Sequence, residues 1–295
     1  MDTLPIAGLS TERDPATVAK LRHALIKYGA FRLWAPELKQ AVAGGLLREA
    51  RGFFQLPNEI KERTIGYSGF GMELIRGTTP VPKEGINFFR KNDHRDGFIP
   101  PPAELFRSVI AIHDVGPSVN LPKISNARTQ FCEHQTWKHS QDQLFDLVFH
   151  DVLESDIPLT GTPALDYETV GIQYYNPQRM ITRCGDYAPP HMDGGTLTIL
   201  IREDDDSDGL EVADLESTEE LGSDGVGREA DFLRVSAASN EVVVMVGTRL
   251  QRMMGRTKAR ACVHRVVGPG QKHSTEDRVS VGIFRACVPH PPPPA

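Results

Sequence analysis

The stretch Pro189-Pro190-His191-Met192-Asp193-Gly194-Gly195-Thr196-Leu197-Thr198-Ile199-Leu200 organises the rest of the sequence. Its second half is rich in apolar and β-branched residues and, with Ile201, predicts a buried strand over residues 197–201. Its first half carries His191 and Asp193. In an extended chain residues i and i+2 project from the same face, so the imidazole and the carboxylate can converge on one point. This pair is half of a metal site or, alternatively, an ordinary hydrogen-bonded pair.

Composition bounds the class of protein. The 295 residues suffice for one large domain or two small ones, and 39% hydrophobic and 24% charged residues are typical of a soluble globular chain. The formal net charge of −6 argues against a nucleic-acid partner. No apolar run reaches the roughly 18 residues of a membrane helix, and the N-terminus does not resemble a signal peptide. We expect neither a nucleic-acid nor a membrane partner.

The four cysteines are far apart and form no C-x-x-C pair; they are Cys132, Cys184, Cys262 and Cys287. Such spacing favours buried free thiols over a disulfide framework. Free thiols indicate a reducing compartment, so we expect the protein in the cytoplasm.

The N-terminal region, residues 1–165, predicts mainly helices that pack on a core. Asp14 and Pro15 are typical of a helix start, and Gly29 can end that helix. A strand is expected over residues 30–34, and a second amphipathic helix over residues 36–54. Residues 66–122 are rich in Gly and Pro with one strand-like piece at residues 86–89, and residues 124–153 predict a long helical region.

The C-terminal half changes to the period of strands. Expected strands lie at residues 170–175, 197–201, 209–212, 231–235, 241–246, 262–267 and 278–284. Short strands at regular spacing indicate a sandwich or barrel. We therefore expect a β core over residues 166–289, followed by a Pro-rich tail at residues 290–295.

His264 is the candidate for a third metal ligand, because it lies within a predicted strand among valines. Two imidazoles and one carboxylate on one side of a metal suit Fe(II), since other positions stay open. A structural zinc would need four ligands, commonly cysteines. Further along, Arg278 and Ser280 share one face of a strand, where a guanidinium and a hydroxyl can hold a carboxylate. Tyr175 could add another hydroxyl.

These motifs together resemble the isopenicillin-N-synthase-like branch of the Fe(II)/2-oxoglutarate-dependent dioxygenases. The pieces occur in the family's order and cover most of the chain. They are Gly29-Ala30-Phe31, the segment 53–61 (FFQLPNEIK), Gly66-Tyr67, Tyr174-Tyr175-Asn176-Pro177, the segments 191–200 and 209–212, the segment 264–267 (HRVV) and Arg278-Val279-Ser280.

The resemblance implies a fold and a set of residue roles. The fold would be mainly β, with a double-stranded β-helix (jelly-roll) core flanked by N-terminal helices. His191, Asp193 and His264 would bind Fe(II). Arg278 and Ser280 would hold the distal carboxylate of the co-substrate 2-oxoglutarate, and Tyr175 would assist. Phe284 falls where relatives often line the substrate pocket.

The implied activity is that of an oxidoreductase that consumes O2 and 2-oxoglutarate and releases succinate and CO2. Hydroxylation, desaturation or oxidative cyclisation would occur at an unactivated C–H of the substrate. We expect that substrate to be a small molecule, such as an amino acid or a secondary metabolite. The enzyme is expected to be a monomer or a weak homodimer.

Several features depart from the family pattern. The segments from Asp193 to His264 and from His264 to Arg278 are longer than usual, which we interpret as surface insertions. Gln173 stands where many relatives have Asn, and Thr248 where many have Asp. The sequence stops soon after Phe284 and lacks the usual C-terminal helix, so the mouth would be more open or covered by another segment or subunit. Because Asp193 is present, a halogenating variant is not favoured.

Two alternatives remain open from sequence. Isopenicillin N synthase and the ethylene-forming amino-cyclopropane oxidase share the R-x-S motif without using 2-oxoglutarate, so the chain could be a 2-oxoglutarate-independent Fe(II) oxidase or cyclase. A non-catalytic jelly roll that binds a small ligand is the other alternative, because fold alone does not establish function.

Overall fold

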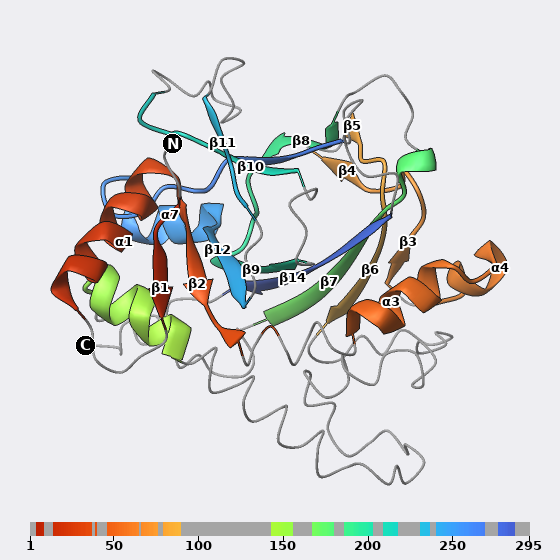
Figure 1. The fold of residues 1–295 in the computed structure, drawn as a ribbon, viewed down its shortest axis with the longest axis horizontal. Helices are drawn as coiled ribbons and strands as arrows, with labels where there is room; N and C mark the ends of the chain where they lie inside the picture. The colour runs from red at the N-terminus through yellow and green to blue at the C-terminus, as the bar shows by residue number, and fades with distance from the viewer. Residues whose placement is uncertain are drawn as a thin grey trace, which may run out of the picture.

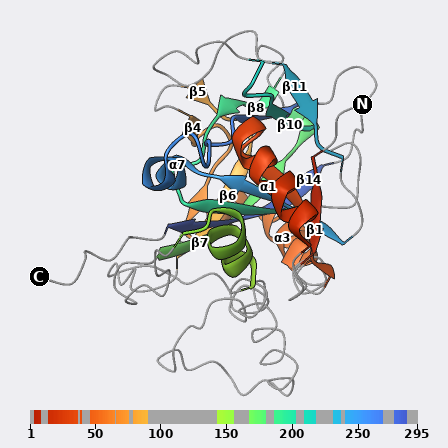
Figure 2. The same cartoon turned by 90° about the vertical axis from the view of Figure 1, so that its left-hand side faces the viewer.

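Two β-sheets face each other in the computed structural model of the chain, one above the other in Figures 1 and 2. One sheet has eight strands and the other four, which gives the predicted double-stranded β-helix core. The structure describes residues 4–8, 14–36, 39, 46–64, 66–75, 79–89, 143–155, 167–179, 186–202, 209–217, 231–236, 240–268 and 277–286.

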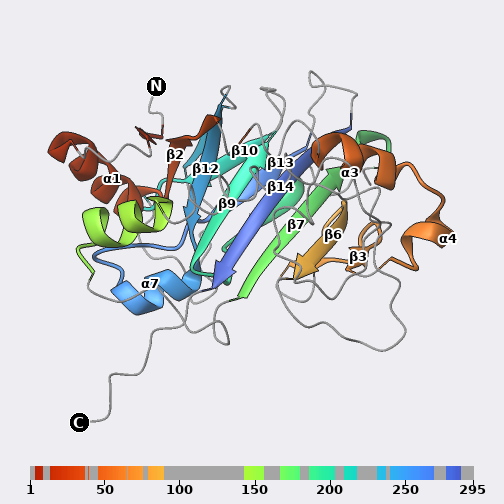
Figure 3. The ribbon, with the colours of Figure 1, turned by 90° about the horizontal axis from the view of Figure 1, so that it is seen from below.

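The large sheet draws strands from both halves of the chain. In spatial order they are β1 (Ile6–Gly8), β2 (Ala30–Trp34), β12 (Glu241–Val246), β9 (Leu197–Arg202), β14 (Arg278–Ala286), β7 (Tyr167–Tyr175), β6 (Glu84–Phe89) and β3 (Tyr67–Ser68) (Figure 3). All neighbours are antiparallel except β1 and β2. The N-terminal region is therefore joined to the core by strand pairing as well as by helices.

The small sheet carries two of the predicted metal ligands. Its order is β11 (Phe232–Arg234), β10 (Leu210–Ala213), β13 (His264–Val267) and β8 (Asp186–His191). A separate two-stranded sheet, β4 (Leu74–Ile75) with β5 (Thr79–Pro80), lies near β8 (Figure 1).

Side chains along the strands of the large sheet point alternately to its two faces, and each face packs into a different apolar cluster. On β7, Ile172 and Tyr174 join the larger apolar cluster, which the sheet shares with the helices, whereas Tyr175 joins the cluster between the two sheets. On β14, Val279 and Val281 belong to the helix-side cluster. Because successive side chains point to opposite faces, Arg278, Ser280 and Phe284 face the space between the sheets.

The helices cover the outer face of the large sheet. Those that contribute to the apolar cluster on this face are α1 (Pro15–Lys27), α3 (Leu46–Phe54), the π-helix η1 (Asp146–Val152) and α7 (Thr248–Met254). The structure also has two short helical elements, α4 (Asn58–Lys61) and the 3-10 turn η2 (Pro177–Arg179). In Figure 3 α3 lies over β14 and β7, and α1 and η1 lie toward the end of the sheet that carries β2. Burying the apolar faces of these helices and of the sheet supplies most of the favourable folding energy of such a layer.

The first predicted helix is confirmed, with its start and end fixed by the expected residues. The Asp14 side chain accepts hydrogen bonds from the backbone N–H groups of Ala16 at 3.2 Å and Thr17 at 3.1 Å. Gly29 has φ +65°, and a Cβ there would lie 2.3 Å from the Arg260 carbonyl oxygen. Only glycine fits both the left-handed backbone and this close approach.

Each of the seven predicted C-terminal strands has a counterpart; the bounds of β12 agree, and those of the other six differ by a few residues. The sequence analysis did not anticipate the strands β1, β3, β4, β5 and β8 or the helical elements α4, η2 and α7. Of the predicted helices at 36–54 and 124–153, the structure describes parts of each, and most of residues 66–122 lies outside the described residues. The predicted domain boundaries near residues 165 and 289 and the tail also lie outside them.

Cys262 is a buried free thiol, as expected, and the other three cysteines lie outside the described residues. Among the described helices, none is both long and apolar enough to cross a membrane.

Candidate functional site

The structure brings the three predicted metal ligands together. His191 is the last residue of β8, and His264 is the first residue of β13; the two residues are paired across the small sheet. Their ring centroids lie 4.2 Å apart. One ligand atom from each of His191, Asp193 and His264 lies within 4.8 Å of the others, a spacing that can hold one metal ion.

One expectation needs a correction. The sequence analysis placed His191 and Asp193 in extended chain at the head of a single strand. In the structure His191 ends β8, whereas Asp193 lies in the turn between β8 and β9. Convergence therefore comes from the turn and from the pairing of β8 with β13.

Hydrogen bonds orient each candidate ligand. Nδ1 of His191 lies 2.8 Å from the carbonyl oxygen of Pro189, and Nδ1 of His264 lies 3.4 Å from that of Cys262. When Nδ1 donates its hydrogen to a carbonyl, the lone pair of Nε2 is available to a metal ion, which is the usual arrangement of a metal-binding histidine. Nε2 of His264 lies 4.0 Å from Oδ1 of Asp193.

The start of α7 holds the turn that carries Asp193. Thr248 donates its backbone N–H to the Asp193 carbonyl at 2.8 Å, and Gly247 and Arg249 donate to the carbonyls of Thr196 at 3.0 Å and Gly195 at 3.1 Å. Sequence reasoning noted Thr248 as a departure from relatives, and its backbone contact with the ligand turn was not predicted. Because a backbone N–H makes the contact, any residue type except proline could supply it.

The electrostatics favour a neutral imidazole at His191. Burial, then the neighbouring His264, lowers the pKa of His191 to about 4, against an opposing effect of Asp193. A neutral imidazole is the form that binds a metal, so the ligand is ready at neutral pH without first losing a proton.

The residues predicted to hold a carboxylate, Arg278, Ser280 and Tyr175, also come together, on the inner face of the large sheet. Arg278 pairs with Tyr175 across β14 and β7, with its guanidinium carbon 4.7 Å from the centre of the tyrosine ring. Ser280 is buried and stands beside Gln173 and Arg202 in the sheet. Nη1 of Arg278 is buried without a hydrogen-bond partner among the described residues.

Tyr187 on β8 completes this group and was not predicted from sequence. Its ring centroid lies 5.0 Å from that of Tyr175, and burial raises the pKa of its hydroxyl to about 12 while the Arg278 charge opposes the shift. The only sequence signal for Tyr187 is its position four residues before His191.

Phe284 lies on the inner face of the large sheet, against a pair of glycines. Gly171 and Gly282 are neighbours across β7 and β14. A Cβ built at Gly282 would lie 2.8 Å from Cζ of Phe284, and one at Gly171 would lie 3.0 Å from its Cε2. The half-buried ring therefore occupies the space that side chains at the two glycines would fill.

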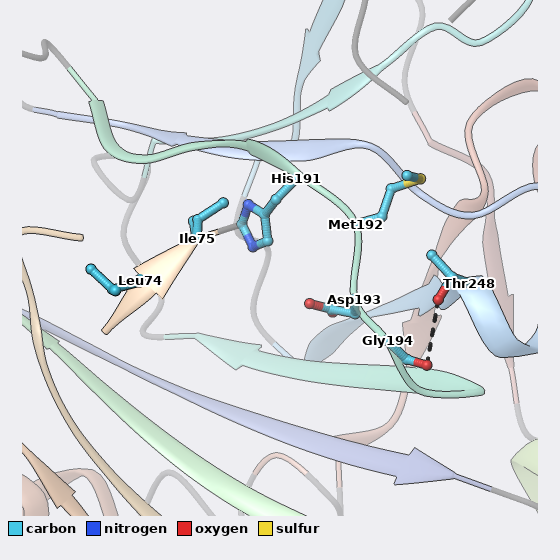
Figure 4. Close-up of a pocket in the computed structure, with 7 residues that line it drawn as sticks. All are labelled: Leu74, Ile75, His191, Met192, Asp193, Gly194 and Thr248. Atoms are coloured by element: carbon cyan, nitrogen blue, oxygen red, sulfur yellow. Dashed lines mark hydrogen bonds between the residues drawn. The ribbon is translucent and has the colours of Figure 1, made fainter. Parts of the chain in front are cut away.

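A cavity of about 390 Å³ opens beside the candidate ligands. Figure 4 shows Leu74 and Ile75 of β4 on one side and Gly194 and Thr248 on the other, and His191, Met192 and Asp193 complete the lining. Phe284 is not among these lining residues. Lys83 bonds to Glu73, the residue before β4, at 3.0 Å and to the side chain of Gln173, which ties the apolar wall of the cavity to β7.

Two family models match the chain. The 2OG-Fe(II) oxygenase superfamily model matches residues 167–286, and the model of the N-terminal region of non-haem dioxygenases in morphine synthesis matches residues 2–101. The chain belongs to the 2OG-Fe(II) oxygenase superfamily. The predicted resemblance to isopenicillin-N-synthase-like enzymes is thereby confirmed.

Solved structures share the fold of this 2OG-Fe(II) oxygenase. Dioxygenase for auxin oxidation 1 from Arabidopsis thaliana, in complex with 2-oxoglutarate, has a TM-score of 0.62 at 18% identity, covering 99% of this chain and 96% of that one. A 2OG-Fe(II) oxygenase family protein from Caulobacter crescentus has a TM-score of 0.63 at 19% identity, covering 98% of this chain and 88% of that one. A Neurospora crassa protein in complex with alpha-KG and thymine has a TM-score of 0.61 at 20% identity, covering 97% of this chain and 86% of that one. No curated protein matches the chain.

Membership of the superfamily makes the protein an oxidoreductase that uses Fe(II), 2-oxoglutarate and O2. The family match favours this activity over the two alternatives left open by the sequence, an oxidase without 2-oxoglutarate and a non-catalytic jelly roll. The donors present suit both groups: two imidazoles and one carboxylate suit Fe(II), and the unpaired buried nitrogen of Arg278 suits a carboxylate.

Proposed function

We propose that this oxygenase oxidises a small organic molecule at a C–H bond, with His191, Asp193 and His264 as the Fe(II) ligands. The single observation that carries the proposal is the convergence of these three donors from two strands and a turn, next to a cavity. Bound Fe(II) and 2-oxoglutarate supply the oxidation, which consumes O2 and releases succinate and CO2.

Arg278, Ser280 and Tyr175 are proposed to hold the distal carboxylate of 2-oxoglutarate. A buried guanidinium nitrogen without a partner costs folding free energy, and a carboxylate supplies the missing acceptor. Ser280 lies two residues after Arg278 on β14 and so on the same inner face, where its hydroxyl can add one donor. The ring of Tyr175 faces the guanidinium and helps to fix its plane.

The substrate is proposed to lie in the cavity beside His191 and Asp193, with Phe284 on the inner sheet as a further contact. Three of the lining residues, Leu74, Ile75 and Met192, are apolar. A volume of about 390 Å³ lies within the usual range of small-molecule pockets. Auxin oxidation and thymine, which the descriptions of two related structures name, also point to small organic molecules. Hydroxylation, desaturation and oxidative cyclisation are the reactions proposed.

The first experiment is an anaerobic titration of the Fe(II)-loaded protein with 2-oxoglutarate, monitored by visible absorption. A charge-transfer band that appears with 2-oxoglutarate and disappears when O2 is admitted supports the site. The same titration on His264→Ala should give no band. A wild-type band that survives this substitution would show that the metal binds elsewhere.

The second experiment addresses the substrate. Small organic acids, heterocycles and amino acids are screened for compounds that accelerate succinate release at fixed 2-oxoglutarate. A small molecule that accelerates the release supports the proposed class. If peptides or oligonucleotides accelerate it and no small molecule does, the proposed substrate class is wrong.

A further inference from the structure

The residue before Arg278 is held on the outer face of the large sheet by two side chains from other elements. The Tyr174 hydroxyl donates to Oδ2 of Asp277 at 2.6 Å, and Nη1 of Arg51 donates to Oδ1 at 3.0 Å. Both terminal nitrogens of Arg51 also donate to the Asp277 carbonyl at 3.2 Å. Arg51 belongs to α3 and Tyr174 to β7, so these contacts tie the start of β14 to a helix and to the adjacent strand.

Consecutive residues here serve opposite faces of the sheet. Tyr174 belongs to the helix-side cluster, and its neighbour Tyr175 belongs to the cluster between the sheets. Asp277 bonds to Tyr174 on the helix side, while Arg278 packs against the ring of Tyr175 on the inner side. The outer contacts therefore fix the backbone from which the inner guanidinium extends.

The position of Arg278 needs such support from its backbone. One of its terminal nitrogens has no protein partner among the described residues, so that nitrogen contributes nothing to holding the side chain in place. A guanidinium binds a carboxylate through two parallel hydrogen bonds whose geometry is strict. A small shift at the start of β14 would misalign both bonds.

The charges of Asp277 and Arg278 are also separated by the sheet, with the carboxylate on the helix side and the guanidinium on the inner side. Asp277 is adjacent to Arg278 in sequence, and a free carboxylate there could compete with a bound carboxylate for the guanidinium. Arg51 neutralises Asp277 on the outer face, and Tyr174 binds its second oxygen. Burial and then the hydrogen bond to Asp277 raise the pKa of Tyr174, so its hydroxyl stays protonated and remains a donor at neutral pH.

We propose that Arg51, Asp277 and Tyr174 form a positioning network that sets the affinity for the distal carboxylate of 2-oxoglutarate through Arg278, without touching the co-substrate. This inference rests on the proposed role of Arg278 as the anchor of that carboxylate. Loss of the network should lower the affinity for a 2-oxo acid that has a distal carboxylate and should not change the affinity for one that lacks it.

The test compares two ligands on the Fe(II)-loaded protein under anaerobic conditions. 2-Oxoglutarate and 2-oxobutanoate share the 2-oxo acid group, but only the first has a distal carboxylate. Asp277→Asn and Tyr174→Phe should each weaken 2-oxoglutarate binding by about tenfold, by analogy with the lower end of the loss seen when an outer partner of a metal ligand is removed. The affinity for 2-oxobutanoate should not change.

Two controls separate this role from general damage to the fold. Glu154→Gln makes the same carboxylate-to-amide change in an exposed ion pair with Arg22, and it should leave both affinities unchanged. Tyr174→Phe keeps the ring that stacks on Phe54 with centroids 4.8 Å apart and removes only the hydroxyl, so it carries the test if Asp277→Asn does not fold. Equal losses for the two ligands would overturn the proposal.

A double-mutant cycle decides whether Asp277 acts through Arg278. In the Arg278→Met background, Asp277→Asn should cause no further loss of 2-oxoglutarate affinity. If Arg278→Met weakens 2-oxoglutarate while Asp277→Asn in the wild-type background does not, only the positioning network is wrong. If Arg278→Met itself leaves 2-oxoglutarate affinity unchanged, the anchor is misassigned and the proposed function fails at that point.

Discussion

Thr198 donates a 2.6 Å hydrogen bond to Oδ2 of Asp193, which leaves Oδ1 as the oxygen that faces His264. Thr198 is fully buried on β9, in the large sheet, whereas the two histidines belong to the small sheet. The large sheet thus fixes the orientation of the Asp193 carboxylate, and the small sheet supplies the two histidines of the proposed metal centre.

Replacing Thr198 with Val should lower the affinity for Fe(II) by about 10- to 100-fold, because outer partners of a metal ligand have effects of that size. The valine keeps the shape of the side chain and removes only the hydroxyl. Equilibrium titration with Fe(II) under anaerobic conditions measures the change. Thr169→Val, on the buried face of β7, is the matched control and should bind Fe(II) like the wild type. Equal affinities for Thr198→Val and wild type would contradict the role of this hydrogen bond.

Asp193→Ala should abolish Fe(II) binding or turnover, because it removes the only carboxylate of the triad. Metal content after anaerobic loading and succinate release are the two measurements. Asp146→Ala, in an exposed pair with His150, serves as the control for the loss of an aspartate. Full oxygenase activity in Asp193→Ala would show that the triad is misassigned.

Much of the core could be predicted because its strands read clearly in sequence. Glu241–Val246 is a run of β-branched and apolar residues with turn residues on both sides, and it forms β12 with the expected bounds. The ligand set could also be proposed early, since His191, Asp193 and His264 follow a known order along the chain. The strand pattern is local, and the ligand set depends only on the order of motifs along the chain, so neither requires knowledge of which strands pair.

β8 was missed for a physical reason. Pro189 and Pro190 argue against a strand, because proline cannot donate to a β ladder. The structure places β8 at the edge of the small sheet, where its outer side needs no donors. The contacts of Asp277 with Arg51 and Tyr174 could not be predicted at all, since the residues are far apart in sequence and meet only through tertiary packing.

Lys61→Met should destabilise the protein by about 3–5 kcal/mol, the usual cost of removing one partner of a buried ion pair. Lys61 and Glu84 are almost fully buried and lie 2.6 Å apart. Tyr67 and Arg179 also bond to Glu84, so the loss should fall at the lower end of this range. Urea unfolding gives the free energy of unfolding. The exposed pair of Arg22 and Glu154 offers a comparison: Glu154→Gln should cost at most about 1 kcal/mol.

Gly171→Ala should disturb the substrate side of the site and spare the metal and co-substrate. A Cβ at residue 171 would lie 2.7 Å from Oδ1 of Asn87 and 3.0 Å from Cε2 of Phe284, so both side chains must move. With a substrate from the screen, the KM for that substrate should rise while the dissociation constant of 2-oxoglutarate stays at the wild-type value. A rise in both would mean that the glycine supports the whole sheet rather than the pocket.

The matched control is Gly52→Ala on α3, where a Cβ would meet nothing within 4 Å. Alanine is the better helix former, so this variant should be more stable than the wild type by about 0.5–1 kcal/mol and should leave both constants unchanged. The two substitutions add the same methyl group, and only the one beside Phe284 is expected to change catalysis. If Gly171→Ala leaves the substrate KM at the wild-type value, Phe284 does not contact the substrate, and the pocket is formed by the residues around β4 alone.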